Sequence, residues 1–374
     1  MKTCSQCGRP DGPGSIIAAK QARCHSCRRA GLAPRAPVAP RMPTEILAAQ
    51  RAAQERAREQ QEFKGMTSHV EVLEKQVEAL KAVRASKPLP PIVPSPKKAS
   101  KSEVVPLILL SDHHCEESVD KAKMHGLNEY SLEIAKKRAG ICAENAAKLI
   151  ASAEKSSTVG RVAVQLGGDF FSGSIHEELM EVNALGPGPA AAYAKELLAR
   201  TIRFWASKFP SLEFDFYCVG GNHGRMTHKT RISTNAENSL ESFMYGFLAS
   251  ECESDRIRFH IAPGDELYAD LFPNYRVRFI HGDQISFQGG VGGLSVPLNK
   301  WVMRANQSIP ANLTCLGHWH QVRADRDWLC NGSLIGPTPY SKRFAFAPEP
   351  PQQVFALIHS KHGRTSVSNI WCQE

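Results

Sequence analysis

Eight residues that could bind metal ions follow five short apolar segments of this sequence. They are Asp112, His114, Asp169, Asn222, His223, His281, His318 and His320. Five of the eight are His, in a chain with 14 His among 374 residues. Imidazole combined with carboxylate suits manganese, iron or zinc, and the absence of Cys at these positions argues against a structural zinc site there. A single such His would more often be an ordinary polar residue, so the repetition is what predicts a metal site.

The segments that precede these residues have the pattern of buried strands. They are Val104–Leu110, Val162–Leu166, Phe214–Val219, Val277–Ile280 and Leu313–Leu316. Helices are expected at about 131–155, 189–208 and 237–250, and a final hairpin at 354–359 and 365–370. This alternation predicts an α/β fold, in which strand ends gather ligands at one edge of the sheet. One Asp at such an edge can bridge two cations about 3.5–4 Å apart, a spacing that suits phosphoryl chemistry.

The stretch Cys218-Val-Gly-Gly-Asn-His-Gly-Arg225 shows how a strand delivers these groups. An apolar run leads directly into a Gly-Gly turn, which can place Asn222 and His223 at the rim of a sheet. Asn222 offers a neutral oxygen ligand, which adds no negative charge against an anionic substrate.

Taken in order, the motifs Asp-x-His, Gly-Asp, Gly-Asn-His, His and Gly-His-x-His resemble those of the calcineurin-like metallophosphoesterase superfamily, over about residues 104–335. The resemblance implies two packed mixed β-sheets flanked by helices, with the site at the strand ends. It also implies two metal-binding sets with His223 outside the metal shell: Asp112, His114 and His320 for the first ion, Asn222, His281 and His318 for the second, and Asp169 as the bridge.

The implied chemistry is hydrolysis of a phosphate ester. Two cations, most plausibly manganese with iron or zinc as alternatives, neutralise the phosphate and lower the pKa of a bridging water far enough to supply hydroxide near pH 7. His223 could then donate a proton to the leaving group, a role typically worth about 10²–10⁴ in rate. Gly224 and Arg225 follow where the family often has an acid, so the partner of His223 must come from elsewhere. Arg225 could contact the substrate phosphate.

The N-terminus carries a separate metal motif. Cys4 and Cys7 are followed after sixteen residues by Cys24 and Cys27. Two Cys-x-x-Cys pairs provide four thiolates for a tetrahedral zinc, so residues 1–31 are expected to form a zinc ribbon with one structural zinc. Such ribbons bind nucleic acid or protein, and the sequence leaves both open.

Two linkers and a helical segment join the ribbon to the main domain. Residues 32–43 are rich in Pro and Ala, residues 44–86 in helix-forming residues, and residues 87–103 in Pro and Lys, which places the phosphoesterase domain at 104–374. Within the helical segment, apolar residues with a/d spacing are Met66, Val70, Leu73, Val77 and Leu80. This seam favours a short coiled coil over residues 66–84 that makes a homodimer, and the alternative is a solitary helix packed on the domain.

Basic charge is concentrated at the front of the chain, where residues 1–103 hold 19 Lys and Arg against 9 Asp and Glu. Such a segment favours nucleic acid or an acidic partner, although it could simply keep an arm solvated. Together with Asn331-Gly-Ser-Leu334, which resembles the DNA repair exonuclease branch, it favours a nuclease. The alternatives are a phosphomonoesterase or protein phosphatase, or a nucleic-acid-binding adaptor with a vestigial hydrolase domain.

Apolar runs, the first residues and the use of Cys indicate where in the cell the protein is expected. No apolar run reaches the roughly 18 residues that a bilayer span needs, and the first residues lack the apolar core of a secretory signal. Eleven Cys, seven of them scattered, suit a reducing cytoplasm better than a disulfide framework. A cytoplasmic protein without membrane contact is therefore expected.

Overall fold

The computed structural model describes residues 103–286 and 293–374, together with scattered helical residues between Arg51 and Lys81. The chain divides into two units, residues 1–72 and 73–374, and every element below belongs to the second. The ribbon residues Cys4, Cys7, Cys24 and Cys27 lie outside the described residues, as do Met66, Leu73 and Leu80 of the apolar seam. Val70 and Val77 of that seam are helical, with 51% and 47% of their surface exposed.

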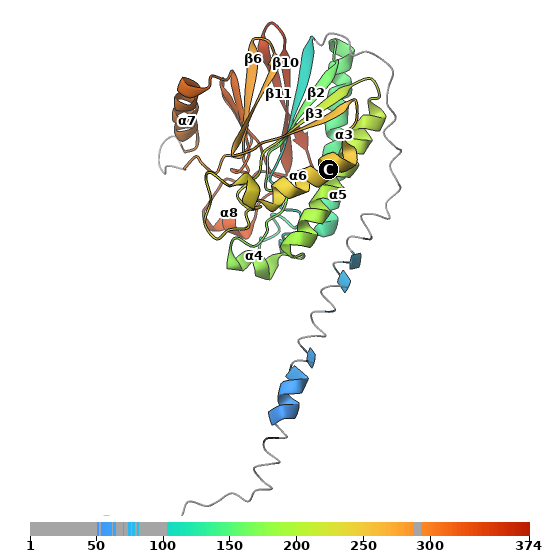
Figure 1. Cartoon of the computed structure of the whole chain (residues 1–374), viewed down its shortest axis with the longest axis vertical. Coiled ribbons are helices and arrows are strands. Elements are labelled where there is room, and N and C mark those ends of the chain that lie inside the picture. The colour runs from blue at the N-terminus through green and yellow to red at the C-terminus, as the bar shows by residue number, and fades with distance from the viewer. Residues whose placement is uncertain are drawn as a thin grey trace, which may run out of the picture. The chain divides into compact units, whose positions relative to one another are not determined.

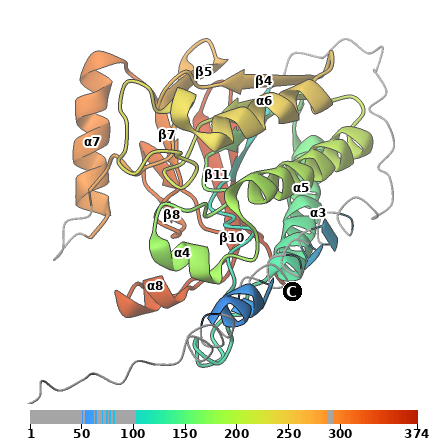
Figure 2. The same ribbon diagram turned by 60° about the horizontal axis from the view of Figure 1, so that its bottom comes forward.

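Two mixed β-sheets pack against each other, with helices on their outer faces (Figures 1 and 2). The first sheet has the order β11 (Gly363–Trp371), β10 (Gln352–His359), β1 (Val104–Leu110), β2 (Arg161–Leu166), β3 (Glu213–Cys218), β4 (Ile257–Ile261). Strands β1 to β4 are parallel, and β10 and β11 are antiparallel to their neighbours. The expected two-sheet fold is thus confirmed.

The second sheet repeats this mixture of directions. Its order is β5 (Glu266–Phe272), β6 (Tyr275–Ile280), β7 (Leu313–Leu316), β9 (Trp328–Cys330), β8 (Arg323–Ala324). The central strands β6, β7 and β9 are parallel, while β5 and β8 are antiparallel edge strands. Parallel neighbours end at the same edge, so each sheet collects several loops there.

The helices follow the strands in sequence. They are α3 (Leu132–Ser156), α4 (Glu177–Val182), α5 (Pro187–Lys208), the 3₁₀ turn η1 (Ala236–Asn238), α6 (Leu240–Cys252), α7 (Ser295–Ser308) and α8 (Pro339–Arg343). Apolar residues of α3, α5 and α6 pack on the first sheet, and those of α7 pack on the second. No helix among the described residues combines the length and apolarity that crossing a bilayer requires.

Strand β1 shows why the central strands are apolar throughout. Leu107 and Leu109 belong to the core between the two sheets, whereas Ile108 and Leu110 belong to the core under the helices. Because successive side chains of a strand point to opposite faces, a strand covered on both sides needs a continuous apolar run. The strand ends at Leu110, and the left-handed backbone at Asp112 and His114 breaks this alternation. Asp112 and His114 face the strand-end cluster, whereas His113 lies with Leu110 on the helical side.

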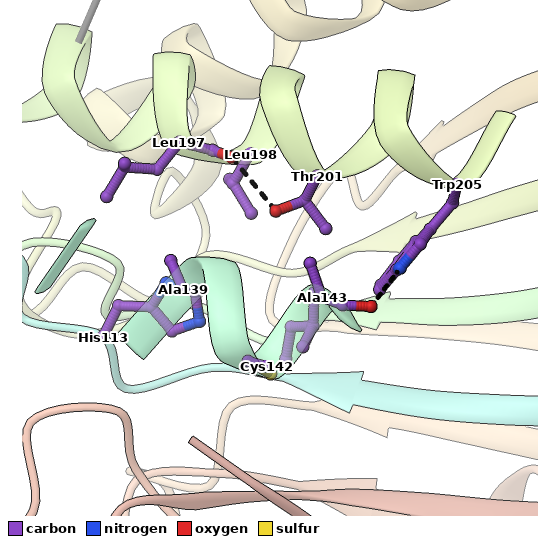
Figure 3. Close-up of a pocket in the computed structure, with 9 residues that line it drawn as sticks. His113, Ala139, Cys142, Ala143, Leu197, Leu198, Thr201 and Trp205 are labelled. Carbon is purple, nitrogen blue, oxygen red and sulfur yellow. Dashed lines mark hydrogen bonds between the residues drawn. The ribbon is translucent and has the colours of Figure 1, made fainter. Parts of the chain in front are cut away.

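His113 therefore faces the helical layer, as Figure 3 shows. It lines a cavity of about 10 Å³ between α3 and α5 with Ala139, Leu197 and Trp205, and its ring meets Phe170 edge-on at 4.7 Å between centroids. Burial lowers the pKa of His113 to about 3, although Asp112 opposes the shift. His113 is thus a neutral core residue and contributes no ligand to the strand-end cluster.

An ion pair between a buried carboxylate and a partly exposed arginine joins β3 to β4. Asp215 on β3 is 3% exposed and accepts hydrogen bonds from Arg258 Nε at 2.8 Å and Nη2 at 3.2 Å. His260 Nε2 lies 3.2 Å from the same carboxylate. Burial alone would raise the pKa of Asp215, but the two bonds from Arg258 outweigh it and hold this pKa below its usual value.

Replacing Asp215 by Asn is expected to lower the free energy of unfolding by about 1–2 kcal/mol at pH 7, because the buried carboxylate loses its charge-assisted bonds to Arg258, whose 40% exposed side chain is partly screened by solvent. The carboxylate stabilises the fold above its unfolded pKa of about 3.9, and this contribution disappears as the pH falls through the lower folded-state pKa. Urea unfolding at pH 7 and below pH 3 measures both effects. A wild-type advantage that stays constant in acid would contradict this account.

Candidate metal centre

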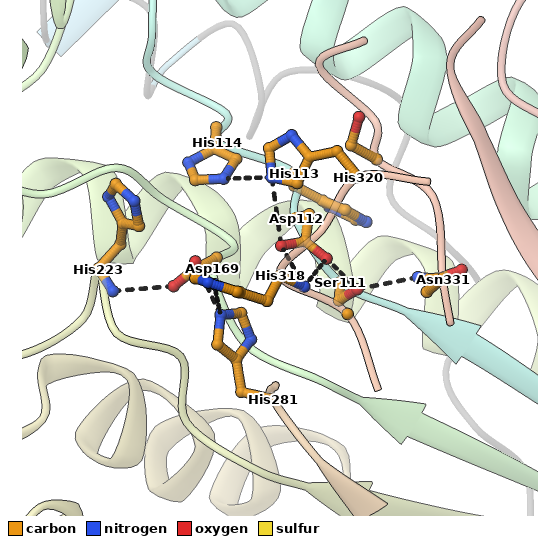
Figure 4. Close-up of polar contacts among 12 residues, drawn as sticks. Ser111, Asp112, His113, His114, Asp169, His223, His281, His318, His320 and Asn331 are labelled. Atoms are coloured by element: carbon orange, nitrogen blue, oxygen red, sulfur yellow. Dashed lines mark hydrogen bonds and ion pairs between the residues drawn. The ribbon is translucent and has the colours of Figure 1, made fainter. Parts of the chain in front are cut away.

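The five strand-end loops meet at one edge of the two sheets, as Figure 4 shows. Strands β1, β2 and β3 are neighbours in the first sheet, and β6 and β7 are neighbours in the second. Three groups of side chains at this edge each bring potential metal ligands within 4.8 Å of one another: Asp112 with His114 and His320, His114 with Asp169 and His223, and Asp169 with His281 and His318. The groups share members, so they form one continuous cluster.

The first group has the spacing of ligands around a single ion. His114 Nε2 and His320 Nε2 are 3.2 Å apart, and His320 Nε2 is 3.3 Å from Asp112 Oδ1. Two ligands that each lie about 2.1 Å from an ion, at an angle of about 90–110°, are about 3.0–3.4 Å apart. His320 thus lies at the distance expected for a shared divalent cation from both His114 and Asp112.

The second group has the same spacing. His281 Nε2 lies 3.0 Å from Asp169 Oδ2, 3.1 Å from Asn222 Oδ1 and 3.3 Å from His318 Nδ1. Asn222 thus joins this group with its carbonyl oxygen, which is a neutral ligand atom. A second cation would have two imidazoles, one amide oxygen and one carboxylate around it, a set that suits manganese, iron or zinc.

Asp169 connects the two halves of the cluster. It belongs to one group with His281 and His318 and to another with His114, which is itself a member of the first group. Its carboxylate is buried, and its Oδ1 also accepts the backbone N–H of His223 at 2.9 Å. Burial by itself would raise the pKa of Asp169, but neighbouring imidazoles, His281 foremost, hold it well below the usual value. This lowered pKa favours the carboxylate form of Asp169, the residue predicted to bridge two ions.

Hydrogen bonds on the outer side of the rings set which nitrogen faces the cluster. His281 Nδ1 lies 2.7 Å from the carbonyl oxygen of Gly167, which can only accept, so Nδ1 carries the proton and Nε2 is free to bind metal. His114 Nδ1 lies 2.9 Å from Ser172 Oγ, whose own proton goes to Glu117 Oε2 at 2.9 Å. His114 must therefore donate from Nδ1 and also present its Nε2 lone pair.

His223 finds its orienting partner in a backbone carbonyl. Its Nδ1 donates to the carbonyl oxygen of Ser172 at 2.8 Å, and its ring meets that of His114 edge-on, with centroids 4.8 Å apart. The Ser172 carbonyl oxygen therefore orients the imidazole of His223. In the resembled family an acid often follows this His, but Gly224 stands at that position here. Ser172 consequently holds two imidazoles, one through its hydroxyl and one through its main chain.

Arg225 lies against the loop that carries Asn222. Its Nη1 donates to the carbonyl oxygen of Asn222 at 3.0 Å, and its Nε donates to that of Thr227 at 3.2 Å. These bonds brace the main chain beside a candidate ligand. The contact between Arg225 and a substrate phosphate stays a prediction, since the bracing bonds already use part of the guanidinium.

Glu241 was not identified as a site residue from the sequence. It is buried, its Oε1 accepts the N–H of Phe170 at 2.8 Å, and its Oε2 accepts the N–H of Gly221 at 2.6 Å. One carboxylate thus joins the loop after β2 to the loop after β3. Burial, together with the charge of Asp169, raises the pKa of Glu241 to about 7. In the sequence it is simply an acid in the first turn of α6, without a distinguishing signal.

Asn331 also supports the cluster from outside. Its Nδ2 donates to Ser111 Oγ at 2.9 Å, and Ser111 Oγ in turn donates to Asp112 Oδ2. Asn331 Oδ1 accepts the N–H of Val354 at 2.9 Å, which ties the loop after β9 to β10. Asn331 thus supports the Asp112 carboxylate through Ser111.

Glycines beside the ligands allow the loops to approach the carboxylates. A Cβ atom on Gly221 would lie 2.1 Å from Asp169 Oδ1, and one on Gly317 would lie 2.4 Å from Asp112 Oδ2. No side chain fits at such distances, which explains why glycine immediately precedes Asn222 and His318.

The main chain at the cluster is unusual. Seven described residues other than glycine have positive φ, and five of them are candidate ligands: Asp112 (55°), His114 (46°), Asp169 (54°), His318 (68°) and His320 (53°). Left-handed conformations at non-glycine residues cost about 1 kcal/mol or more each and concentrate at functional sites. The backbone strain at this edge therefore coincides with the side chains that could bind metal.

Comparison with known proteins adds only weak similarities. No family model matches the sequence, and no curated protein matches it. Similar solved structures include vacuolar protein sorting 29 of Cryptosporidium parvum, at 12% identity and a TM-score of 0.29 over 71% of this chain and 96% of that one. A predicted phosphoesterase of Streptococcus pneumoniae has 11% identity and a TM-score of 0.26 over 71% and 97%. PhoD has 8% identity and a TM-score of 0.27 over 73% and 70%.

Proposed function

We propose that residues 104–374 form a metal-dependent phosphoesterase that uses two divalent ions and acts on phosphodiesters of nucleic acids. The observation that carries the proposal is Asp169, whose buried carboxylate belongs to one group of ligands with His281 and to another with His114. The motif order that resembles the calcineurin-like metallophosphoesterases agrees with that arrangement.

The residues of the cluster would have distinct roles in hydrolysis. Divalent ions bound by the two groups would neutralise the phosphate charge and lower the pKa of a bound water. His223 would give the proton on its Nε2 to the departing alkoxide, while the bond from its Nδ1 to the Ser172 carbonyl holds the ring in place. Asn222 would keep the second ligand set less negative than a carboxylate would.

The choice of nucleic acid as substrate rests on the front of the chain. A zinc ribbon at Cys4, Cys7, Cys24 and Cys27 and the surplus of Lys and Arg in residues 1–103 would attract phosphates without regard to base sequence. A coiled coil over residues 66–84 would place two such arms on a homodimer. These features support a nuclease over the alternative of a phosphomonoesterase or protein phosphatase.

The test is hydrolysis by the full-length chain with manganese, comparing bis(4-nitrophenyl) phosphate, 4-nitrophenyl phosphate, single- and double-stranded DNA, RNA and a phosphopeptide. A phosphodiesterase should cleave the diester and a nucleic acid and lose both activities in EDTA. Preference for the monoester and the phosphopeptide would favour the phosphatase alternative. Nucleic-acid binding without hydrolysis of any ester would leave the adaptor as the function.

The contribution of the arm is measured in the same protein. Replacing Lys97, Lys98 and Lys101 by Gln should weaken binding of single-stranded DNA and reduce the salt dependence of Kd, by roughly 0.7 in log–log slope for each lost phosphate contact. Unchanged affinity and slope would exclude these lysines from substrate capture.

A further inference from the structure

Three aromatic side chains gather on the surface at α8 and the turn after it. Tyr340, Phe344 and Phe346 are 66%, 54% and 37% exposed. Their rings contact one another, with centroids 4.8 Å apart for Tyr340 and Phe344, 6.2 Å for Phe344 and Phe346, and 6.4 Å for Tyr340 and Phe346. We call these three residues the aromatic platform. Exposed aromatic clusters of this kind mark binding sites more often than isolated apolar residues do.

The platform is held in shape by its own main chain. Thr338 caps α8 in a reciprocal pair of bonds with Ser341, and the N–H of Phe346 donates to the carbonyl oxygen of Ser341 at 2.9 Å. Ala345 has a φ of 52°, a left-handed turn that brings Phe346 back toward Tyr340. The rings are therefore presented by an ordered turn, so a ligand would meet a preformed surface.

A short connection links the platform to the metal-binding cluster. The N–H of Leu334 donates to the carbonyl oxygen of Asp112 at 3.0 Å. Arg138 and Asn128 then fix the next residues, with bonds of 2.7 Å to the carbonyl oxygens of Ile335 and Pro337. Because Tyr340 follows Leu334 by six residues, its Cα lies at most about 20 Å from that of Leu334. A chain of three or four nucleotides can span such a distance.

The arrangement of the helices also places α8 near the strand-end loops. Figures 1 and 2 both show α8 beside α4, which is part of the connection after β2 that also carries Asp169. The platform thus lies at the end of the domain where the strand-end loops meet.

Basic side chains lie on α8 and on one segment next to it, whereas the neighbouring α4 carries Glu177, Glu178 and Glu181. Lys342 and Arg343 belong to α8 itself, and Lys342 Nζ donates to the carbonyl oxygen of Lys123 at 3.3 Å, which places the segment 121–127 next to it. Segment 121–127 carries two Lys and segment 339–346 carries one Lys and one Arg, and neither segment contains Asp or Glu. Aromatic rings interleaved with such cations suit a polyanion whose flat groups can stack, which is the chemistry of unpaired nucleotides.

We propose that the aromatic platform stacks unpaired bases of a single-stranded nucleic acid, while Lys342 and Arg343 neutralise its phosphates and the strand leads toward the metal-binding cluster. The proposal rests on the proposed function and deepens it by naming single strands as the substrate class. Duplex DNA keeps its bases stacked on each other, so it cannot use the rings in the same way.

The experiment measures binding without catalysis. Full-length protein in EDTA is titrated into a fluorescein-labelled oligothymidine of about 12 nucleotides and into a duplex of equal length, and Kd is read by fluorescence anisotropy. The double variant Y340A/F344A should bind the single strand about 10- to 100-fold more weakly, since each lost stacking contact weakens binding several-fold or more. The variant Y340F/F344Y, which keeps both rings, should bind like the wild type.

A matched control uses two exposed phenylalanines elsewhere. Phe243 and Phe247 on α6 are 51% and 68% exposed, so F243A/F247A removes as much exposed aromatic surface and should leave the Kd unchanged. Thermal melting of each variant shows that it is folded. Replacing Lys342 and Arg343 by Gln should reduce the log–log salt slope for the single strand by about 1.4.

Three outcomes would overturn the proposal. The first is a Kd of Y340A/F344A equal to that of the wild type. The second is an equal loss of affinity for single strand and duplex, which would mean that the rings do not stack bases. The third is a change of oligomeric state in sedimentation without a change in Kd, which would make the platform a contact between copies of this chain. Failure of the wild type to hydrolyse bis(4-nitrophenyl) phosphate would instead refute the proposed hydrolase, because binding in EDTA does not depend on it.

Discussion

Replacing Asp169 by Asn is expected to lower phosphodiester hydrolysis by at least about 10³-fold, corresponding to roughly 4 kcal/mol of transition-state stabilisation. The substitution removes the one negative charge shared between the two ligand groups, while an amide still accepts the N–H of His223. Asn also tolerates the left-handed backbone at this position, where φ is 54°. The fold should therefore persist, and the loss should come from the cations.

Metal content by mass spectrometry and manganese titration by calorimetry measure this directly, with fewer than two ions per chain expected in the Asp169→Asn variant. Asp215→Asn is the matched control, since it makes the same exchange at a buried carboxylate of β3 outside the candidate ligand groups. That variant should be less stable but bind metal normally below its melting temperature. Two tightly bound ions and full activity in Asp169→Asn would contradict the prediction that Asp169 bridges the ions.

Replacing His223 by Gln is expected to reduce kcat by about 10²–10⁴ for substrates with poor leaving groups and to leave the metal content unchanged. A proton donor matters most when the leaving group is a basic alkoxide, as in a nucleic acid strand. With 4-nitrophenolate, which leaves without protonation, the loss should be much smaller. The dependence on leaving group distinguishes proton donation from a metal-binding or structural role.

The measurement is a comparison of kcat for DNA and for bis(4-nitrophenyl) phosphate in the wild type and the variant. His176→Gln serves as the control, because His176 is an exposed imidazole whose ring centroid lies 6.3 Å from that of His223. Its effect should stay within a few-fold. An equal loss on both substrates, or a loss of bound metal, would remove His223 from the role of general acid.

The strands that position the cluster could be predicted because they are buried on both faces. Continuous apolar runs such as Val104–Leu110 leave little ambiguity, and α3, α5 and α6 begin and end within a few residues of the expected ranges. Strands β4 and β5 were missed, since partly exposed edge strands mix polar and apolar residues. The pairing of β1 with β10 joins residues about 250 positions apart, which no local pattern encodes.

The residues of the candidate site also divide into those that a local sequence pattern shows and those that only the folded structure shows. Asp112, His114 and the other candidate ligands could be found because each follows a strand directly. Glu241 and Ser172 could not, and Asn331 was noted only for its resemblance to one branch of the family, because the roles of all three depend on contacts between loops that are distant in the sequence. The partner of His223 is a main-chain carbonyl, which a sequence does not display at all. The ribbon and coil stay predictions, as their defining residues lie wholly or mostly outside the described part of the chain.

The left-handed backbone at five candidate ligands also limits which substitutions evolution can try there. Asp, Asn and His enter this conformation several-fold more readily than most other residues, so they are tolerated on conformational as well as chemical grounds. Glu and Cys bind divalent ions too, yet both would carry a steric penalty at these positions. A descendant of this protein could therefore shift toward a thiolate-based or Glu-rich metal preference only after the loops themselves had been rebuilt.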